Sequence, residues 1–284
     1  MAAPHDKLDL LQQSDFTKVA SFIETTTGIR VPPGKKTMVE GRLRRRARAL
    51  GLATIGDYCR VVFEEGGFDA ESAHLIDAVT TNKTDFFREP SHFETLRTRC
   101  LPEAAARDAG FKRPYKVWSA ACSVGAEPYT LAMVMADFAE TAGGNWQYQI
   151  LASDISTQVL AKAAQAIYPE EMIEPVPMEM RKRYLLRSKD RSRPQVRIVP
   201  RLRQTVSLLH LNLMNARYPV DGDFDVIFCR NLLIYFERST QDTVIGRLCR
   251  HLRPGGYLFL GHSESLSSKE LPLEWLGDAT FKRA

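Results

Sequence analysis

The sequence predicts a doubly wound α/β fold with a small all-α domain in front of it. Beyond Thr81, short β-like runs are each followed by a helical stretch, at Tyr115 to Ser119, Tyr148 to Ser153, Phe224 to Cys229 and Tyr257 to Gly261. This alternation is typical of a parallel sheet with helices on both faces. Residues 1–80 instead show apolar residues at helical spacing. We therefore expect a helical domain over 1–80 and an α/β domain over 81–284.

Four helical stretches are expected in residues 1–80. The first follows the capping candidates Ser14 and Asp15 and stops at Gly28. A turn at 31–34 leads into the second, whose predicted apolar face holds Val39, Leu43, Ala47 and Leu50. The third and fourth are expected near residues 55–65 and 70–79.

The charge is concentrated in two basic clusters, although the net charge is only +5. The first lies between Arg30 and Arg48, where Arg44, Arg45 and Arg48 are predicted to project from the face opposite the apolar one. The second lies between Arg181 and Arg203. Such surfaces suit an acidic macromolecular partner, and an ordinary solvated face explains the same charges equally well.

Residues 168–209 interrupt the β/α alternation with prolines that include Pro175, Pro177, Pro194 and Pro200, and with the alternating apolar pair Val196 and Ile198. We interpret this stretch, about 170–209, as an inserted small antiparallel β subdomain.

No signal peptide, transit peptide or apolar run long enough for a membrane helix is visible, so we expect a cytoplasmic protein without direct membrane insertion. The five cysteines are widely spaced, with no Cys-x-x-Cys pair. We expect them to be reduced and mostly buried, and we predict no metal site.

Candidate ligand-binding residues follow the first two predicted strands. The small-residue loop from Ala121 to Gly125 lets the backbone approach a ligand closely, although a tight packing turn is an alternative. Asp154 ends the second strand, where doubly wound folds place a carboxylate for ribose hydroxyls. Capping of the helix that starts near Ser156 is the competing role.

Two further segments mix polar and aromatic residues. The strand that ends at Phe228 runs directly into Cys229-Arg230-Asn231-Leu232-Leu233-Ile234-Tyr235-Phe236. The segment Thr80 to Glu89 is unusually polar for one that contains two adjacent phenylalanines, and helix capping by Thr84 or Asp85 would explain it without a ligand.

These segments give the chain a resemblance to the bacterial chemotaxis receptor glutamate O-methyltransferases, the CheR family. The motifs are Thr81-Asn82-Lys83-Thr84-Asp85-Phe86-Phe87-Arg88, Trp118-Ser119-Ala120-Ala121-Cys122-Ser123-Val124-Gly125-Ala126-Glu127-Pro128-Tyr129, Ala152-Ser153-Asp154-Ile155 and Ile227 to Phe236. Their order and spacing agree with the family over nearly the whole chain. The resemblance implies methyl transfer from S-adenosylmethionine to receptor glutamates, leaving S-adenosylhomocysteine, with no metal.

The resemblance also implies roles for individual residues. Those implied to bind the cofactor are Asn82, Thr84, Arg88, Ala121, Glu127, Asp154, Asn212, Leu213, Asn231 and Leu232. Arg88 and Tyr235 are implied to contact the substrate carboxylate. The Arg44, Arg45, Arg48 face is expected to dock on the cytoplasmic helices of chemoreceptors, with the enzyme acting as a monomer. His92, His210 and His262 are expected to be structural.

The inserted subdomain departs from one family pattern. Members that tether to a receptor's C-terminal peptide usually carry a glycine-containing loop there, whereas Leu186 to Pro194 contains no glycine. Two rival functions remain at this point. One is a methyltransferase fold that only binds cofactor, and the other is a nucleic-acid methyltransferase, which the basic clusters would suit but which lacks an Asn/Asp-Pro-Pro-Tyr motif.

Overall fold

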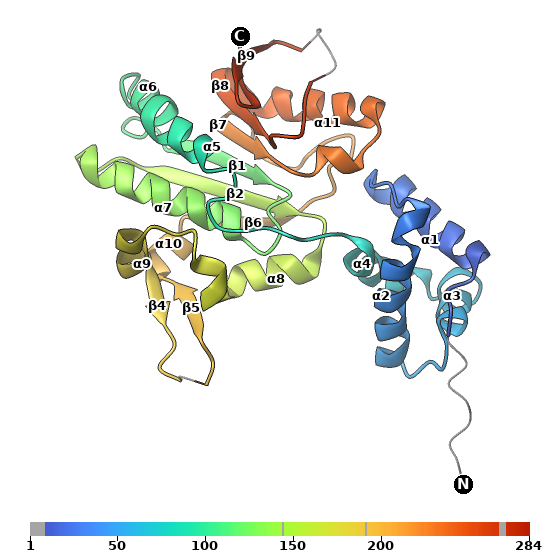
Figure 1. The fold of residues 1–284 in the computed structure, drawn as a ribbon. Coiled ribbons are helices and arrows are strands. Elements are labelled where there is room, and N and C mark those ends of the chain that lie inside the picture. Colours follow the sequence, from blue (N-terminus) through green and yellow to red (C-terminus); the bar gives the residue numbers. More distant parts are fainter. Residues whose placement is uncertain (1–8, 144, 191, 267–270) are drawn as a thin grey trace. The chain divides into compact units, whose positions relative to one another are not determined.

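The computed structural model describes residues 9–143, 145–190, 192–266 and 271–284. It divides into two compact units, Met1–Thr81 and Asn82–Ala284, and each is considered by itself (Figure 1). The fold class is the predicted one, an all-α unit followed by a doubly wound α/β unit with a small antiparallel sheet.

The described part of the first unit is helical. Its elements are α1 (Gln13–Thr27), η1 (Pro33–Lys35), α2 (Lys36–Ala49), α3 (Ile55–Phe63) and α4 (Phe68–Val79). Gly28 ends α1 in a left-handed conformation, with φ of 74°, as the sequence predicts. The start was predicted wrongly, because the helix begins at Gln13 and the candidates Ser14 and Asp15 lie within its first turn.

Helix α2 buries Val39, Leu43 and Ala47 as predicted, but Leu50 lies beyond its end and is 41% exposed. Several of its arginines hold the unit together. Arg42 donates to the carbonyl oxygens of residues 78–80 at the end of α4, and Arg46 forms two hydrogen bonds of 2.7 and 2.6 Å with the Glu71 carboxylate. Much of this basic run therefore has a structural role.

The second unit is built on a mixed sheet. Among the described residues its strands run in the order β6-β2-β1-β7-β8-β10-β9. The strands β6, β2, β1, β7 and β8 are parallel to one another. The strands are β1 (Tyr115–Ala120), β2 (Tyr148–Asp154), β6 (Val206–His210), β7 (Phe224–Cys229), β8 (Leu252–Leu260), β9 (Leu273–Gly277) and β10 (Thr280–Arg283). The four predicted strands are all present. The antiparallel pairing of β10 with β8 and β9 was not predicted.

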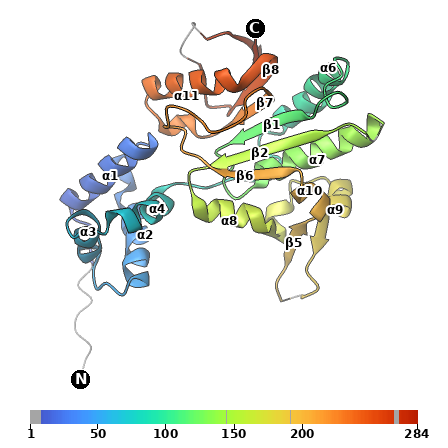
Figure 2. The ribbon, with the colours of Figure 1, turned by 180° about the vertical axis from the view of Figure 1, so that it is seen from behind.

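Helices surround this sheet (Figure 2). They are α5 (Pro90–Thr95), η2 (Leu96–Cys100), α6 (Leu101–Ala105), α7 (Ala126–Thr141), α8 (Thr157–Gln165), η4 (Leu233–Tyr235) and α11 (Arg238–His251). The chain moves outward from β1 through α7 to β2, and in the opposite direction from β7 through α11 to β8. Because such crossovers are right-handed, α7 and α11 cover opposite faces, and the order reverses between β1 and β7. A ligand site is expected at the carboxyl ends of the strands next to this reversal.

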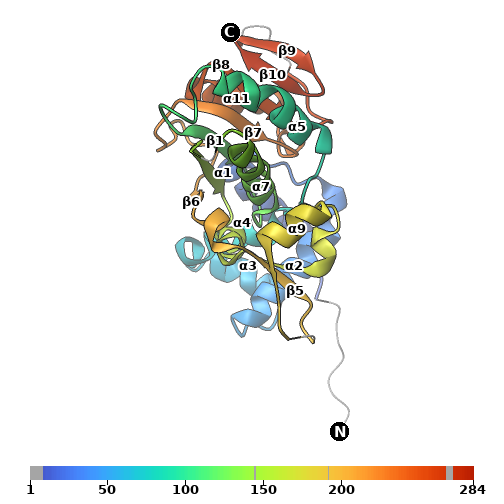
Figure 3. The ribbon, with the colours of Figure 1, turned by 90° about the vertical axis from the view of Figure 1, so that its left-hand side faces the viewer.

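The inserted subdomain is an antiparallel sheet of order β3-β5-β4, shown with α9 in Figure 3. Its elements are β3 (Ile167–Pro169), η3 (Glu170–Ile173), α9 (Met178–Tyr184), β4 (Leu185–Arg187), β5 (Gln195–Ile198) and α10 (Pro200–Arg203). The predicted end at residue 209 was too late, because β6 pairs in parallel with β2 and belongs to the main sheet.

All five cysteines are buried and unpaired, as expected. Burial raises the pKa of the Cys249 thiol to about 11 and that of Cys59 to about 12, so both thiols are protonated near neutral pH.

Candidate functional site

The register of the main sheet places several predicted site residues in one row. Ala120 pairs with Ser153 of β2 on one side and with Cys229 of β7 on the other, while Asp154 pairs with His210 of β6. The segments that follow these strands therefore leave the sheet next to one another. They carry the predicted residues Ala121, Asn212, Leu213, Asn231 and Leu232, and the predicted Asp154 is the last residue of β2.

The backbone at this edge is unusually constrained. Ala121, Ser123 and Gly125 have positive φ values of 60°, 52° and 94°, and Asn231, after the adjacent strand β7, has a φ of 58°. Non-glycine residues rarely adopt this conformation, and such residues gather at ligand sites when the surrounding structure holds them in place. The loop after β1 is therefore a candidate ligand-binding loop as well as the connection between β1 and α7.

The Asp154 carboxylate organises this loop. Its Oδ2 accepts from the Ser123 amide at 2.9 Å, and its Oδ1 accepts from the Ser156 amide at 2.9 Å. The cap of α8 is Ser156, whose hydroxyl accepts from the Val159 amide at 3.3 Å, so Asp154 is not the N-cap residue itself. The carboxylate is 7% exposed and fixes the position of two neighbouring turns.

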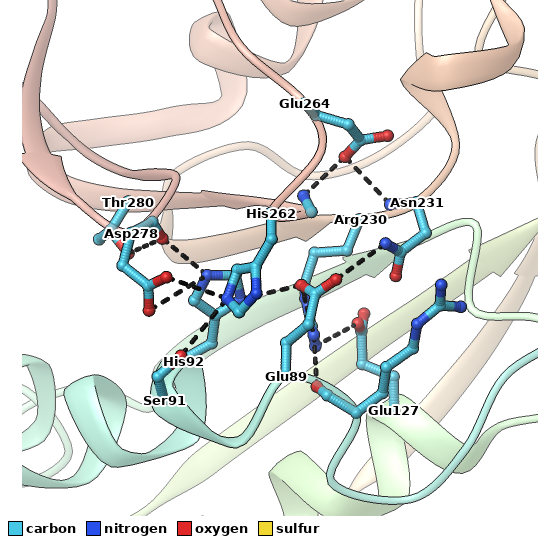
Figure 4. A network of polar contacts seen from close by, with 12 residues as sticks. Glu89, Ser91, His92, Glu127, Arg230, Asn231, His262, Glu264, Asp278 and Thr280 are labelled. Carbon is cyan, nitrogen blue, oxygen red and sulfur yellow. Dashed lines mark hydrogen bonds and ion pairs between the residues drawn. The ribbon is translucent and has the colours of Figure 1, made fainter.

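A buried arginine links three segments of the site (Figure 4). Arg230, whose side chain is 2% exposed, donates from Nη1 to Glu127 Oε2 at 3.1 Å and from Nη2 to Glu89 Oε2 at 2.9 Å. It also donates to the Arg88 carbonyl oxygen. Glu127, in the first turn of α7, also accepts from the Ser119 hydroxyl at 2.7 Å. Burial raises the pKa of Glu127, although Arg230 and Ser119 oppose this shift.

Asn231 is held from two sides. Its amide Nδ2 donates to Glu89 Oε1 at 3.0 Å, and its backbone amide donates to Glu264 Oε2 at 3.0 Å. Glu264 is a buried carboxylate that also accepts from the backbone amides of Gly261, at 2.6 Å, and Ile234, at 3.3 Å. It connects the turn after β8 to the segment after β7.

The segment that precedes α5 reaches the same place. The Asn82 carbonyl accepts from the Ser123 hydroxyl at 2.9 Å, and Thr84 is half-buried in the segment between Asn82 and α5. Arg88 is half-buried, and its guanidinium donates to the Lys83 carbonyl at 3.1 Å. Asn82 is thus joined to the loop after β1, and Arg88 to the end of β7.

The remaining predicted residues lie on two other segments. Asn212, after β6, accepts through Oδ1 from the Met214 amide at 2.9 Å, and Leu213 is 7% exposed. Leu232 and Tyr235 are half-buried in and next to η4, which follows β7.

The predicted partner face on α2 needs a correction. Arg44 does not project freely, because its guanidinium donates to Glu40 Oε1 at 2.9 Å and to the Asp9 carbonyl, and the side chain is only 28% exposed. Arg45 and Arg48 are exposed and form no ion pair with any described residue. Arg45 and Arg48 are therefore the available cations of this face.

Three residues of the network were missed as site residues from the sequence. Glu89 and Glu264 carry no signal in the sequence, because their partners are distant: Arg230 lies 141 positions after Glu89. Arg230 is a polar residue directly after a predicted strand, and this position is the signal in the sequence that could assign it to the site. Of the helices that the structure describes, none is long and apolar enough to cross a bilayer.

Two family patterns match the chain. "CheR methyltransferase, all-alpha domain" matches residues 14–80, and "CheR methyltransferase, SAM binding domain" matches residues 82–280.

Individual relatives agree with these matches. The "Chemotaxis protein methyltransferase" of Escherichia coli (strain K12) is 40% identical over 271 residues, which is 95% of this chain and 91% of that protein. The "Chemotaxis protein methyltransferase 2" of Pseudomonas aeruginosa is 38% identical, over 96% of this chain and 94% of that protein. The "Chemotaxis protein methyltransferase" of Borreliella burgdorferi is 32% identical, over 96% and 95% respectively.

Proposed function

This chain belongs to the CheR methyltransferase family of S-adenosylmethionine-dependent enzymes of chemotaxis, and we propose that it methylates the side-chain carboxylates of specific glutamates on chemoreceptors. The products are glutamyl methyl esters and S-adenosylhomocysteine. The observation that carries the proposal is the row of polar and constrained residues at the carboxyl ends of β6, β2, β1 and β7.

The donor set of this row fits the cofactor. The Asp154 carboxylate, with both oxygens oriented by backbone amides, is suited to accept from the two ribose hydroxyls. Asn212 and Leu213, after the neighbouring strand β6, would border the adenine. Ala121 would approach the methionine end with its backbone, while Asn82 and Thr84 would contribute from the segment before α5. Glu127, Asn231 and Leu232 would line the side nearer β7.

The chemistry requires alignment more than acid or base catalysis. When bound, S-adenosylmethionine supplies an electrophilic sulfonium methyl group. A free glutamate has a pKa of about 4.3, so the substrate carboxylate is already a nucleophile near neutral pH. Holding it at near-attack distance can contribute roughly 7 to 11 kcal/mol through proximity and orientation. The residues of this chain are therefore needed to bind and orient.

Arg88 and Tyr235 are the proposed orienting residues. The planar guanidinium of Arg88 can bind a carboxylate at two points, and its single described hydrogen bond, to the Lys83 carbonyl, leaves other N–H groups for a substrate. Tyr235 is half-buried on η4, which follows β7 and the residues Arg230 and Asn231. Both residues stand next to the Glu89–Arg230–Asn231 contacts in sequence and would thus be presented by a rigid framework.

Receptor docking is assigned to Arg45 and Arg48 on α2. Both are exposed cations in the all-α unit, and an acidic helix surface would be complementary to them. An RNA partner would be attracted by the same charges, so the substrate assay must include it.

The test is to incubate the protein with radiolabelled S-adenosylmethionine and either receptor-containing membranes or RNA. Carboxyl methyl esters release methanol in mild base, whereas base-methylated RNA does not. We expect base-labile label on the receptors. Label on RNA would show that the substrate is RNA instead of a receptor. Cofactor binding without any methyl transfer would show that the protein only binds the cofactor.

A further inference from the structure

Two histidines and a glutamate meet beside the site but take no part in the proposed methyl transfer. Glu89 immediately precedes α5, His92 lies in the first turn of that helix, and His262 lies just after β8. One possible ligand atom from each residue lies within 4.8 Å of the others. Figure 4 shows the three side chains next to one another, with Asp278 beside the two imidazoles.

The buried imidazole of His92 has an unused nitrogen. Its side chain is fully buried, and Nε2 lies 2.7 Å from the Asp278 carbonyl oxygen. A carbonyl can only accept, so Nε2 carries the proton and Nδ1 presents a lone pair. Nδ1 has no hydrogen-bond partner among the described residues and faces Glu89 Oε2 at 3.6 Å. Two acceptors thus face each other across a gap that a cation would stabilise.

The backbone contact of His92 is the one expected of a metal ligand. Histidine ligands in metal sites usually donate their second ring N–H to a carbonyl or carboxylate. The Nε2 of His92 already makes this contact with the Asp278 carbonyl.

We propose that Glu89, His92 and His262 form a Zn²⁺ site, with water completing the coordination. Two imidazoles, one carboxylate and an open position are a common zinc ligand set. Bonds of about 2.0 to 2.1 Å in tetrahedral geometry separate the ligand atoms by about 3.3 Å. The 3.6 Å between His92 Nδ1 and Glu89 Oε2 is close to that separation. The His262 side chain is 43% exposed, which leaves a path from solvent, and its Nε2 lies 3.0 Å from Asp278 Oδ1.

A metal ion would compete with Arg230 and Asn231 for the Glu89 carboxylate. The same carboxylate accepts from Arg230 at 2.9 Å and from Asn231 at 3.0 Å. A dication close to the guanidinium would be repelled by it, so coordination draws Glu89 away from Arg230. We therefore expect reversible binding, weaker than at zinc sites that support folding, and a change in the segment that ends at Glu89.

The experiment uses the full chain after treatment with a chelator. Calorimetric titration with Zn²⁺ should show one site, and Co²⁺ should give visible d–d bands typical of tetrahedral coordination. Zn²⁺ should also raise the melting temperature in a concentration-dependent way. His262→Gln, at an exposed position, should keep the fold and weaken binding by at least about tenfold. His74→Gln, in the all-α unit, is the matched control and should bind as the wild type does.

The proposal has two ways to fail. Absence of Zn²⁺ and Co²⁺ binding to the wild-type chain would overturn it. Equal binding by wild type and by a folded His262→Gln variant would also overturn it, because the ion would then be held elsewhere, for example by cysteines. All of these measurements are independent of methyl transfer, so they stand whatever the substrate of the enzyme is.

Discussion

Arg230 donates to Glu127 at 3.1 Å and thereby joins the end of β7 to the first turn of α7. The Arg230 side chain is 2% exposed, and a second carboxylate, Glu89, lies 2.9 Å away. Removing this guanidinium would leave two carboxylates in a largely buried position without their cation. The cost of such a loss is much greater than the cost of losing a surface ion pair.

We therefore expect Arg230→Ala to lower the free energy of unfolding by about 3 to 5 kcal/mol, as measured by urea titration. Lys182→Ala is the control, because Lys182 and Glu179 form an ion pair with side chains 64% and 78% exposed. That control should change stability by at most about 1 kcal/mol. Similar losses in the two variants would contradict the central role of Arg230.

The second prediction concerns cofactor affinity. Asp154→Ala should weaken S-adenosylmethionine binding by roughly 1.5 to 3 kcal/mol, the range for hydrogen bonds to a charged group. Calorimetry measures the dissociation constant directly. Because Asp154 also holds the Ser123 and Ser156 amides, the melting temperature must be compared in parallel. An unchanged dissociation constant in a folded variant would show that Asp154 does not bind the cofactor.

The main sheet could be predicted because its central strands are buried on both faces. All six residues of β7 are buried, and the four residues from Val226 to Cys229 form an apolar run that stands out in the sequence. The short strands β9 and β10 give no such signal. The exposed residues of β9 include Trp275, which is 68% exposed, and its pairing becomes evident only in three dimensions.

The candidate site was predictable to the extent that its residues follow strands. Asp154 ends the second predicted strand and Asn231 lies two residues beyond β7, so their positions in the chain already indicate the carboxyl edge of the sheet. The Glu89–Arg230 and Asn231–Glu264 contacts could not be read in this way, because they join segments whose proximity depends on the whole fold. The prediction that Arg44 projects freely was wrong for a local reason, because Glu40, four residues earlier on the same helix, pairs with its charge.

The third prediction concerns receptor docking. The double variant Arg45→Glu/Arg48→Glu should raise the receptor KM and leave S-adenosylmethionine affinity unchanged, with an effect that shrinks at high salt. Arg97→Glu is a suitable control, because Arg97 is exposed on the other unit and pairs with Glu94. If the receptor KM at low salt is the same in the double variant and the wild type, Arg45 and Arg48 have no role in docking and are ordinary solvated residues.

The fourth prediction is a pH dependence of stability at Glu103. Burial raises the pKa of this carboxyl, but hydrogen bonds from Tyr257, Lys282 and Arg99 outweigh burial and lower it from 4.5 to about 2. A carboxyl with a lowered pKa in the folded state stabilises the protein above its unfolded pKa, and this contribution is lost as the pH falls. Wild type should therefore exceed Glu103→Gln in stability near neutral pH.

The difference between the two proteins should shrink as the pH decreases from about 4.5 toward about 2, the window set by the shift. Urea titrations of both proteins across this range measure it. A difference that stays constant down to the acid limit would mean that the Glu103 charge contributes nothing, and that only packing or neutral hydrogen bonds were altered.

The last prediction concerns Arg88, whose guanidinium donates to the Lys83 carbonyl and whose own carbonyl accepts from Arg230. If the guanidinium aligns the substrate carboxylate, Arg88→Ala should lower turnover far more than it weakens S-adenosylmethionine binding, because an interaction made in the transition state is lost from kcat. Arg88→Lys should restore little, since a point charge cannot reproduce a planar two-point contact.

If Arg88 only braces the segment before α5, the Arg88→Ala variant should instead have a lower melting temperature, a lower cofactor affinity and a lower activity together. Melting temperature, calorimetric affinity and single-turnover methylation on one preparation separate these outcomes. A stable Arg88→Ala variant that binds cofactor and methylates receptor at the wild-type rate would exclude both roles.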